Sequence, residues 1–146
     1  MSLILDTHVF FWWITDDPRL ESRHREAITN SSNVIHVSAV SGWEIGIKVK
    51  LGKWPEAAVL LPDLTSKVRA EGFFTLDLTL SQSEAAGALE LVHKDQFDRL
   101  IAAQSLDLQW TVATVDTAFG RLGCKTSSIR VWSARGGPVE RRQLVR

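Results

Sequence analysis

The sequence predicts an α/β protein in which a central parallel sheet of about four to five strands carries helices on both faces. Three observations support this prediction. Short apolar segments typical of buried strands alternate with longer segments typical of helices. Hydrophobic residues make up 45% and charged residues 23% of the chain, which excludes a disordered or fibrous protein. The length of 146 residues corresponds to one domain with its own core.

Short apolar segments are predicted to be strands, because each is bounded by polar or turn-forming residues. In chain order they are residues 3–5, 34–37, 73–78, 111–115 and 128–132. At least one helical segment separates each strand from the next, so we expect parallel pairing through right-handed crossovers.

Helices are predicted where capping and breaking residues enclose a segment of suitable length. Pro18 stands at a permitted early position, Ser41 is a candidate N-cap, and Gly52 ends the helix that follows. Residues 81–84, Ser-Gln-Ser-Glu, have the pattern of a capping box. The predicted helices are residues 9–14, 18–29, 42–51, 55–70 with a break at Pro62, 81–91, 97–108 and 117–122.

Simple sequence features exclude several classes of protein. No apolar run approaches the roughly 18 residues that span a bilayer. Asp6 interrupts the first apolar segment, which argues against a signal peptide. Cys124 is the single cysteine, so no internal disulfide forms. We therefore expect a cytoplasmic protein without membrane contact, in which residues 1–132 form one domain and residues 133–146 a basic tail.

The net charge of zero conceals an asymmetry along the chain. Residues 1–116 hold 10 Lys and Arg against 16 Asp and Glu, a net charge of −6. Residues 117–146 hold 7 Lys and Arg against one acid, a net charge of +6. This split predicts an acidic site on the body of the protein and a basic C-terminal surface, which either contacts nucleic acid or only adds solubility.

Four acidic residues are expected to meet at one edge of the sheet. Asp6 ends the first predicted strand and Asp116 the fourth, and sites in open α/β sheets lie beyond these carboxyl ends. Glu44 and Asp98 lie in the first turns of predicted helices that point at the same edge. Because four carboxylates in one cleft repel one another, they need a cation, and oxygen-only ligands suit Mg²⁺ or Mn²⁺. The chemistry indicated is phosphodiester hydrolysis by a metal-bound water.

Each acid also has a purely structural interpretation. Asp6 and Asp116 are suitable helix caps, and Asp95 is a candidate N-cap for the helix that follows it. Glu44 lies four residues before Lys48, which is the spacing of an ordinary helical ion pair. The functional interpretation therefore rests on all four acids falling at the same edge.

Other motifs for catalysis are absent from the sequence. It contains no His-Glu-x-x-His, no Gly-x-x-x-x-Gly-Lys loop and no Gly-x-Ser-x-Gly elbow. The tryptophans are interpreted mainly as core residues. Trp12, Trp13 and Trp43 are predicted to be buried, and Trp54 and Trp132 to be partly exposed.

Four segments of the chain contain the four acids. The first is Leu-Ile-Leu-Asp-Thr-His-Val at residues 3–9, and the second is Val-Ser-Ala-Val-Ser-Gly-Trp-Glu-Ile at residues 37–45. The third is His-Lys-Asp-Gln-Phe-Asp-Arg-Leu-Ile at residues 93–101, and the fourth is Thr-Val-Ala-Thr-Val-Asp at residues 111–116. In this order the segments resemble the motifs of PIN-domain toxins of the VapC type. The resemblance covers roughly residues 3–132 and implies a PIN-like fold.

The resemblance implies an Mg²⁺- or Mn²⁺-dependent endoribonuclease that leaves a 5′-phosphate and a 3′-hydroxyl. It further implies a homodimeric toxin that a cognate antitoxin keeps inactive. Asp95 is then an auxiliary acid, and Thr114 is the hydroxyl residue that helps to hold a water or an acid near the metal. The acidic site that matches the family is Asp6, Glu44, Asp98 and Asp116.

The sequence departs from the family pattern at two positions. Gln96 stands where Pro is common, and Val115 stands where Arg is common. Neither change removes an acid, but a missing Arg weakens contacts to phosphate. The candidate RNA-binding residues are Arg99, Arg135, Arg141 and Arg142.

Other classes of protein fit parts of the pattern. A phosphatase with Asp6 as nucleophile needs a second acid two residues later, where the chain has His8. A signalling receiver domain needs paired acids after the first strand and a lysine on the fifth, and neither is suitably placed. A catalytically inactive PIN-like binding module normally lacks one of the acids, and all four are present. We therefore expect an enzyme, with the inactive binding module as the alternative.

Overall fold

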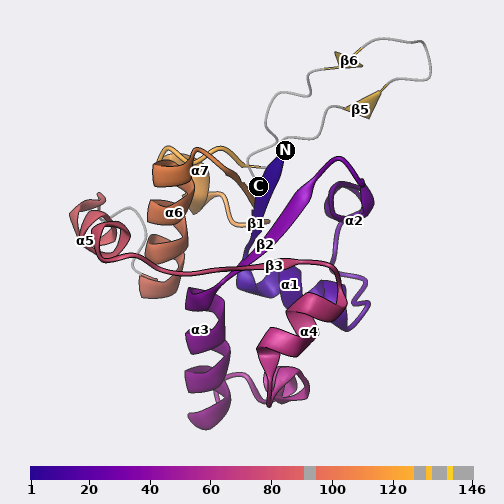
Figure 1. Cartoon of the computed structure of the whole chain (residues 1–146), viewed down its shortest axis with the longest axis vertical. Coiled ribbons are helices and arrows are strands. Elements are labelled where there is room, and N and C mark those ends of the chain that lie inside the picture. Colours follow the sequence, from indigo (N-terminus) through magenta and orange to yellow (C-terminus); the bar gives the residue numbers. More distant parts are fainter. Residues whose placement is uncertain (91–94, 127–130, 133–137, 140–146) are drawn as a thin grey trace.

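The structure is a computed structural model that describes residues 1–90, 95–126, 131–132 and 138–139 (Figure 1). Its centre is a four-stranded parallel sheet with the strand order β3-β2-β1-β4. The strands are β1 (Ser2–Leu5), β2 (Val34–Ser38), β3 (Phe74–Leu76) and β4 (Thr111–Ala113). The predicted parallel α/β fold is therefore confirmed.

Strand β1 lies between β2 and β4, and its sequence suits this central place. Leu3 pairs with Ile35 of β2 on one side and with Thr111 of β4 on the other. Leu3, Ile4 and Leu5 are all fully buried. A strand with helices on both faces has no polar face, so a continuous apolar run is what this position requires.

Helices cover both faces of the sheet, as predicted. The helices are α1 (Thr7–Ile14), α2 (Ser22–Thr29), α3 (Ala39–Lys50), the 3₁₀ helix η1 (Pro55–Leu60), α4 (Leu64–Ala70), α5 (Leu80–Ala88), α6 (Gln96–Leu108) and α7 (Ala118–Arg121). Leu3 and Leu5 join a core with residues of α1, α2 and α4. Ile4 joins a second core with residues of α6 and α7, which lie on the opposite side of the sheet in Figure 1. The alternation of side chains along β1 thus divides the interior into two cores.

Several helices begin at residues other than those predicted, and the differences at α2 and α3 have a clear cause. The helix predicted from Pro18 begins only at Ser22, because the Asp17 carboxylate accepts hydrogen bonds from Arg19 and holds the chain in a turn. The helix predicted from residue 42 begins at Ala39, because the hydroxyl of Ser38 accepts a hydrogen bond from the amide of Val40 and caps it. The N-cap residues are Glu21 for α2 and Ser38 for α3, each earlier or later in the chain than the sequence pattern predicts.

Helix α5 and the last strands also differ from the prediction. The capping box consists of Thr79 and Gln82, so α5 begins slightly earlier than predicted and ends at Ala88. Strand β5 (Val131–Trp132) pairs antiparallel with β6 (Pro138–Val139) and adds no fifth strand to the central sheet. The rest of the predicted strand 128–132 and of the predicted tail 133–146 lies outside the described residues.

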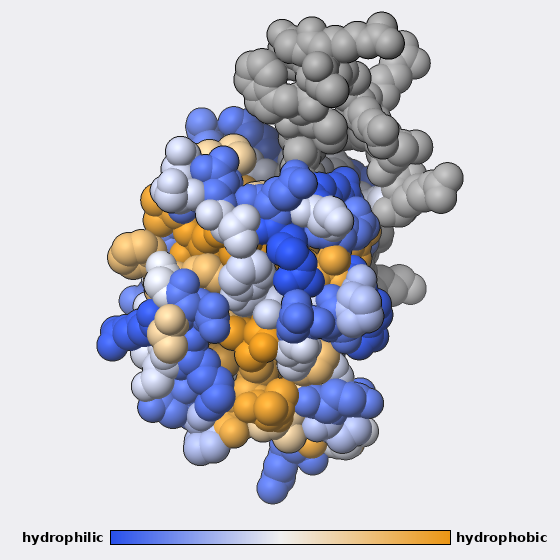
Figure 2. Space-filling model, turned by 90° about the vertical axis from the view of Figure 1, so that its right-hand side faces the viewer, coloured by the Kyte–Doolittle hydropathy of each residue, from blue (hydrophilic) through white to orange (hydrophobic). Residues whose placement is uncertain are grey.

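The surface of the described part combines polar and apolar regions. Figure 2 shows apolar side chains gathered at the centre of the lower half of one face, with further apolar patches in its upper half. Val59 of η1 is among the exposed large apolar residues. Over the described residues, none of the helices has the length and apolar character needed to cross a membrane.

Candidate active site

Asp6 is a buried carboxylate at the carboxyl end of the central strand. It lies directly between β1 and α1, and it is 5% exposed. Burial raises its pKa above the ordinary value of 3.8, and the nearby charge of Glu44 adds to the rise. The hydroxyl of Thr114 donates a hydrogen bond of 2.7 Å to Asp6 Oδ2 and opposes that rise. Asp6 is the N-cap residue of α1, but its side chain makes no capping hydrogen bond of ordinary geometry, and the charge and backbone of His8 in the first turn also oppose the rise in pKa.

Glu44 is a second buried carboxylate, which lies near Asp6. It is 2% exposed, and it lies in the second turn of α3 rather than the predicted first turn, because the helix begins at Ala39. Lys48 Nζ lies 2.5 Å from Glu44 Oε2, which confirms the helical ion pair. Glu44 Oε1 has no hydrogen-bond partner among the described residues. An unpaired buried carboxylate oxygen is unfavourable, and it marks a place where a cation would fit.

Lys48 is the basic group among these acids. Burial opposes its charge, but the hydrogen bond and charge of Glu44 outweigh burial and raise the pKa of Lys48. The charges of Asp95 and Asp98 act in the same direction. The positive charge of Lys48 therefore interacts favourably with acids on α3 and at the start of α6.

The acids at the start of α6 differ in role. Asp95 is the N-cap, and its Oδ1 accepts hydrogen bonds from the amides of Phe97 (2.9 Å) and Asp98 (3.1 Å). The structural interpretation of Asp95 as a cap is therefore confirmed. Asp98 is half-buried in the first turn of α6, as predicted. The cap fixes the backbone from which the Asp98 side chain projects.

Asp116 lies three residues beyond the end of β4, which stops at Ala113. Its amide donates a 2.9 Å hydrogen bond to Thr114 Oγ1, and its Oδ1 accepts a 2.9 Å bond from the amide of Ala118. The hydroxyl of Thr114 thus bonds both to Asp6 and to the backbone of Asp116. Asp116 therefore bonds to the first residue of α7, but the N-cap of that helix is Thr117 and not Asp116 as predicted.

The predicted four-acid cluster is only partly assembled by these contacts. Thr114 bonds to both Asp6 and the backbone of Asp116, and Lys48 bonds to Glu44 while its charge is influenced by Asp98. Over the described ranges, no group of three or more His, Cys, Asp or Glu side chains is arranged to hold a metal ion. The metal-binding role of the four acids therefore stays a prediction.

Buried hydroxyl and amide groups that the sequence did not single out position the helices around the site. Thr7 Oγ1 and Ser41 Oγ are 2.7 Å apart and fully buried, and they join the beginnings of α1 and α3. Ser38 Oγ donates a 2.6 Å bond to Gln104 Oε1 of α6. Thr7, directly after Asp6, is the member of this network that adjoins a predicted acid in the sequence.

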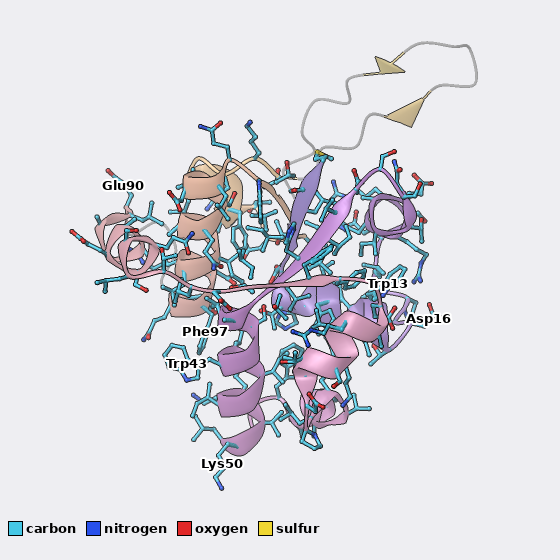
Figure 3. All side chains as sticks on the ribbon, in the orientation of Figure 1. Trp13, Asp16, Trp43, Lys50, Glu90 and Phe97 are labelled. Carbon is cyan, nitrogen blue, oxygen red and sulfur yellow. The ribbon has the colours of Figure 1, made fainter. Side chains whose placement is uncertain are left out.

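The aromatic residues only partly follow the prediction. Trp12 is buried and Trp54 half-buried, as predicted, but Trp43 is 56% exposed and the prediction of a core position is wrong. Successive helical residues point in different directions, and α3 turns Glu44 inward, which leaves Trp43 at the surface. Figure 3 shows Trp43 on the outside of α3, close to Phe97 at the beginning of α6. The side chain of Trp132 lies outside the described residues.

The candidate RNA-binding arginines are not seen as one surface. Arg99 is buried, and its guanidinium donates hydrogen bonds to the carbonyls of Ala86, Leu89 and Glu90 at the end of α5. RNA contact by Arg99 stays a prediction, and this burial argues against it. The other three candidates are basic residues of the predicted tail and lie outside the described residues: Arg135, Arg141 and Arg142.

Comparison with known proteins defines the class to which this fold and site belong. The model of the PIN domain family matches residues 3–124, so the chain belongs to the PIN domain family. A relative within that class is Ribonuclease VapC22 of Mycobacterium tuberculosis, which is 29% identical over 117 residues, 79% of this chain and 87% of the relative. The resemblance to VapC-type proteins inferred from the four motifs is thereby confirmed.

A solved structure has a similar fold. This structure is VapBC2 from Rickettsia felis bound to a DNA fragment from the VapBC2 promoter. It superposes on the chain with a TM-score of 0.57 at 16% sequence identity. The match covers 86% of this chain and 96% of that one. At this level of identity the likeness concerns the fold, in agreement with the central parallel sheet described above.

Proposed function

We propose that the chain is a metal-dependent endoribonuclease and the toxin of a toxin–antitoxin pair. The observation that carries the proposal is the pair of buried carboxylates, Asp6 and Glu44, at the carboxyl edge of the sheet. Buried like charges are unfavourable for stability, so their presence there indicates a use in binding or catalysis. The ribonuclease name of the VapC22 relative supports the same activity.

A divalent cation fits the chemistry of these residues. The candidate ligands are carboxylates, which suit Mg²⁺ or Mn²⁺, and Glu44 Oε1 is buried without a partner in the described part of the chain. When bound, such a cation acts as a Lewis acid toward the scissile phosphate. The residues proposed to hold it are Asp6, Glu44, Asp98 and Asp116.

The roles of the surrounding residues follow from their contacts. Thr114 keeps the Asp6 carboxylate in a fixed orientation through its hydroxyl. Lys48 balances the charge of Glu44, and its ammonium supplies a positive charge that interacts with Asp98. A group fixed before the substrate arrives needs no rearrangement when charge develops on the phosphate. We expect hydrolysis to leave a 5′-phosphate and a 3′-hydroxyl.

The partners proposed for the chain are RNA as substrate and a cognate antitoxin, together with a second copy in a homodimer. The VapBC2 structure supports an antitoxin as partner, because that protein, which has a similar fold, was solved as a complex.

The second candidate function is an inactive binding module. The contact between Lys48 and Glu44 favours it, because an internal cation already neutralises one of the acids.

An assay of RNA cleavage tests the proposal. The purified protein is incubated with several structured RNAs and Mg²⁺ or Mn²⁺, beside an EDTA control and the variant Asp98→Asn. We expect EDTA to abolish cleavage and Asp98→Asn to slow it by at least about a hundredfold, the size seen when a charge-stabilising group is lost. The matched control is Glu84→Gln, an exposed acid on α5, which leaves cleavage unchanged. Cleavage that survives both EDTA and Asp98→Asn contradicts the proposal.

A further inference from the structure

Trp43 is an exposed tryptophan at the edge of the candidate active site. Its side chain is 56% exposed, although the next residue, Glu44, is 2% exposed. The turn of α3 that buries the carboxylate therefore presents the indole to solvent beside it. Tryptophan carries a large apolar surface that folding normally covers at least in part. An exposed indole in this place has surface available for a ligand.

The indole is held by a second aromatic ring. The rings of Trp43 and Phe97 are 5.0 Å apart between centroids and meet edge to face at 73°. Phe97 is half-buried, packs against the core on the α6 side of the sheet, and has its amide bound by the N-cap Asp95. Figure 3 shows the two rings between α3 and α6. We call Trp43 and Phe97 the aromatic platform.

The platform is tied to the acids by sequence and by charge. Trp43 immediately precedes Glu44, and Phe97 immediately precedes Asp98, so the Cα atom of each aromatic residue lies about 3.8 Å from the Cα atom of an acid. Lys48, which bonds to Glu44, places its ammonium 5.5 Å from the centre of the Phe97 ring. The platform therefore adjoins the ion pair of Lys48 with Glu44.

The charge around the site limits what kind of attraction binds RNA there. Glu44, Asp95 and Asp98 repel phosphates, and Lys48 is the cation that they share. Stacking of a base on an aromatic ring does not depend on the sign of the surrounding charge. We propose that Trp43, supported by Phe97, stacks on an unpaired base of single-stranded RNA next to the scissile phosphate. This inference rests on the proposed ribonuclease function and adds the contact that holds its substrate.

The distribution of exposed apolar residues favours a base over a protein partner. A protein interface needs a continuous apolar surface. In the described part of the chain, the exposed apolar residues Val59, Phe74 and Leu80 lie on elements other than α3 and α6. Leu51 is also exposed, but it follows the C-terminal end of α3, whereas Trp43 lies near the N-terminal end. Leu106 lies on α6, like Phe97, but near the other end of that helix. The platform therefore offers one exposed ring, which suits a single flat base.

Binding of labelled RNA tests the platform. Full-length protein is titrated with a fluorescein-labelled single-stranded 12-nucleotide RNA at low salt in EDTA. We expect Trp43→Ala to weaken binding about tenfold, the effect of losing one stacked base, and Trp43→Phe to retain most of the affinity. The matched control is Leu51→Ala, an equally exposed apolar residue that follows the same helix, which leaves affinity unchanged.

Two further readouts separate stacking from a structural role. The slope of log affinity against log salt stays the same in Trp43→Ala, because no phosphate contact is lost. Removing one base of the RNA, at the position that meets the platform, weakens binding to the wild type and causes no further loss in Trp43→Ala. A loss of affinity that is equal for intact and abasic RNA overturns the proposal.

The remaining outcomes distinguish this inference from the proposed function. A wild type that cleaves RNA but binds it no better than Trp43→Ala overturns the platform alone. A wild type that neither binds nor cleaves RNA overturns the platform together with the ribonuclease. A dimer that becomes a monomer in Trp43→Ala, measured by sedimentation, assigns the indole to a subunit interface and also overturns the platform.

Discussion

The Asp6 carboxylate makes opposite contributions to stability and to the proposed activity. Its pKa is raised above 3.8, so the folded state binds this proton more tightly than the unfolded chain does. Stability therefore falls as the pH rises from the unfolded value through the raised one, and at neutral pH the buried charge opposes folding. We expect Asp6→Asn to abolish RNA cleavage and to raise Tm by a few degrees, roughly the effect of 1 kcal/mol in a domain of this size.

Differential scanning calorimetry in EDTA measures this effect. The comparison is Thr114→Val, which removes the hydroxyl that bonds to Asp6 and is expected to lower Tm. A lower Tm for Asp6→Asn means that the carboxylate stabilises the fold, and it removes one reason for assigning Asp6 a function.

Lys48 makes the reverse contribution, because it neutralises a buried acid. Lys48→Gln leaves Glu44 without its counter-charge. We expect a loss of about 1–3 kcal/mol in the free energy of unfolding, less than for a fully buried pair because the Lys48 side chain is 25% exposed. Mn²⁺ should restore more stability to Lys48→Gln than to the wild type, since a bound cation takes over the charge balance.

Urea unfolding with and without Mn²⁺ measures both parts of this expectation. The control is Lys50→Gln, which removes an exposed lysine from the end of the same helix. An equal Mn²⁺ effect in Lys48→Gln and in the wild type indicates that Lys48 and the cation occupy separate places.

At the residue scale, the sequence predicts the acids and the ion pair of Glu44 with Lys48, but not the geometry around Asp6. Asp6 follows from the rule that parallel strands end at a shared edge of the sheet, and Glu44 from the helix that begins at that edge. The bond from Thr114 to Asp6 joins residues 108 positions apart, and its geometry depends on how β1 and β4 pair. The exposure of Trp43 depends on the rotation of α3, which is set by packing rather than by the local sequence.

At the element scale, α2 contains a buried histidine whose protonation opposes folding. His24 is fully buried, and neither ring nitrogen makes a hydrogen bond of ordinary geometry within the described residues. Burial lowers its pKa from 6.5 to about 4, the positive charge of Arg23 adds to this, and Glu21 and a backbone contact with Thr114 act against it. The unfolded chain takes up a proton below pH 6.5 and the folded chain only near pH 4, so stability falls across this window as the pH falls.

His24→Leu should remove this pH dependence, because leucine does not titrate. The wild type is expected to lose up to about 3 kcal/mol between pH 7 and pH 4 through this residue, at about 1.4 kcal/mol per pKa unit. Urea unfolding midpoints at several pH values measure the difference. Ile28→Val, a core change one turn further along α2, should lower stability and keep the slope. A slope that persists in His24→Leu contradicts the assignment.

Local sequence patterns predict that an element exists better than they predict its first residue or its neighbours in the sheet. The existence of α1, α3 and α6 followed from periodicity and caps, but their first residues did not, because neighbouring Ser, Thr and Asp residues compete as caps. Ser38 and Thr79 became caps where Ser41 and Ser81 were predicted. The strand order β3-β2-β1-β4 is set by pairings between distant segments, on which local patterns carry no information.

At the scale of the whole molecule, charge divides the chain into an acidic body and a basic end. If the tail contacts RNA as predicted, replacing Arg135, Arg141 and Arg142 together with glutamine should weaken RNA binding. The slope of log affinity against log salt should fall by about 2 units, since each phosphate contact on a single strand contributes roughly 0.7. Fluorescence anisotropy at several salt concentrations measures the slope.

The control for this experiment is a triple change of exposed basic residues on the body, Lys50, Lys53 and Arg69. A smaller change in slope is expected there. Equal slopes for the tail variant and the wild type mean that the basic end only adds solubility, which is the alternative that the sequence left open.

The central position of β1 also affects when the site forms during synthesis. Asp6 is among the first residues to leave the ribosome, but its hydroxyl partner, Thr114, is 108 residues further along the chain. Contacts between such distant segments form late in folding. A nascent chain that stops before β4 lacks Thr114 and Asp116 altogether. The carboxylates therefore come together only when translation of the domain is almost finished.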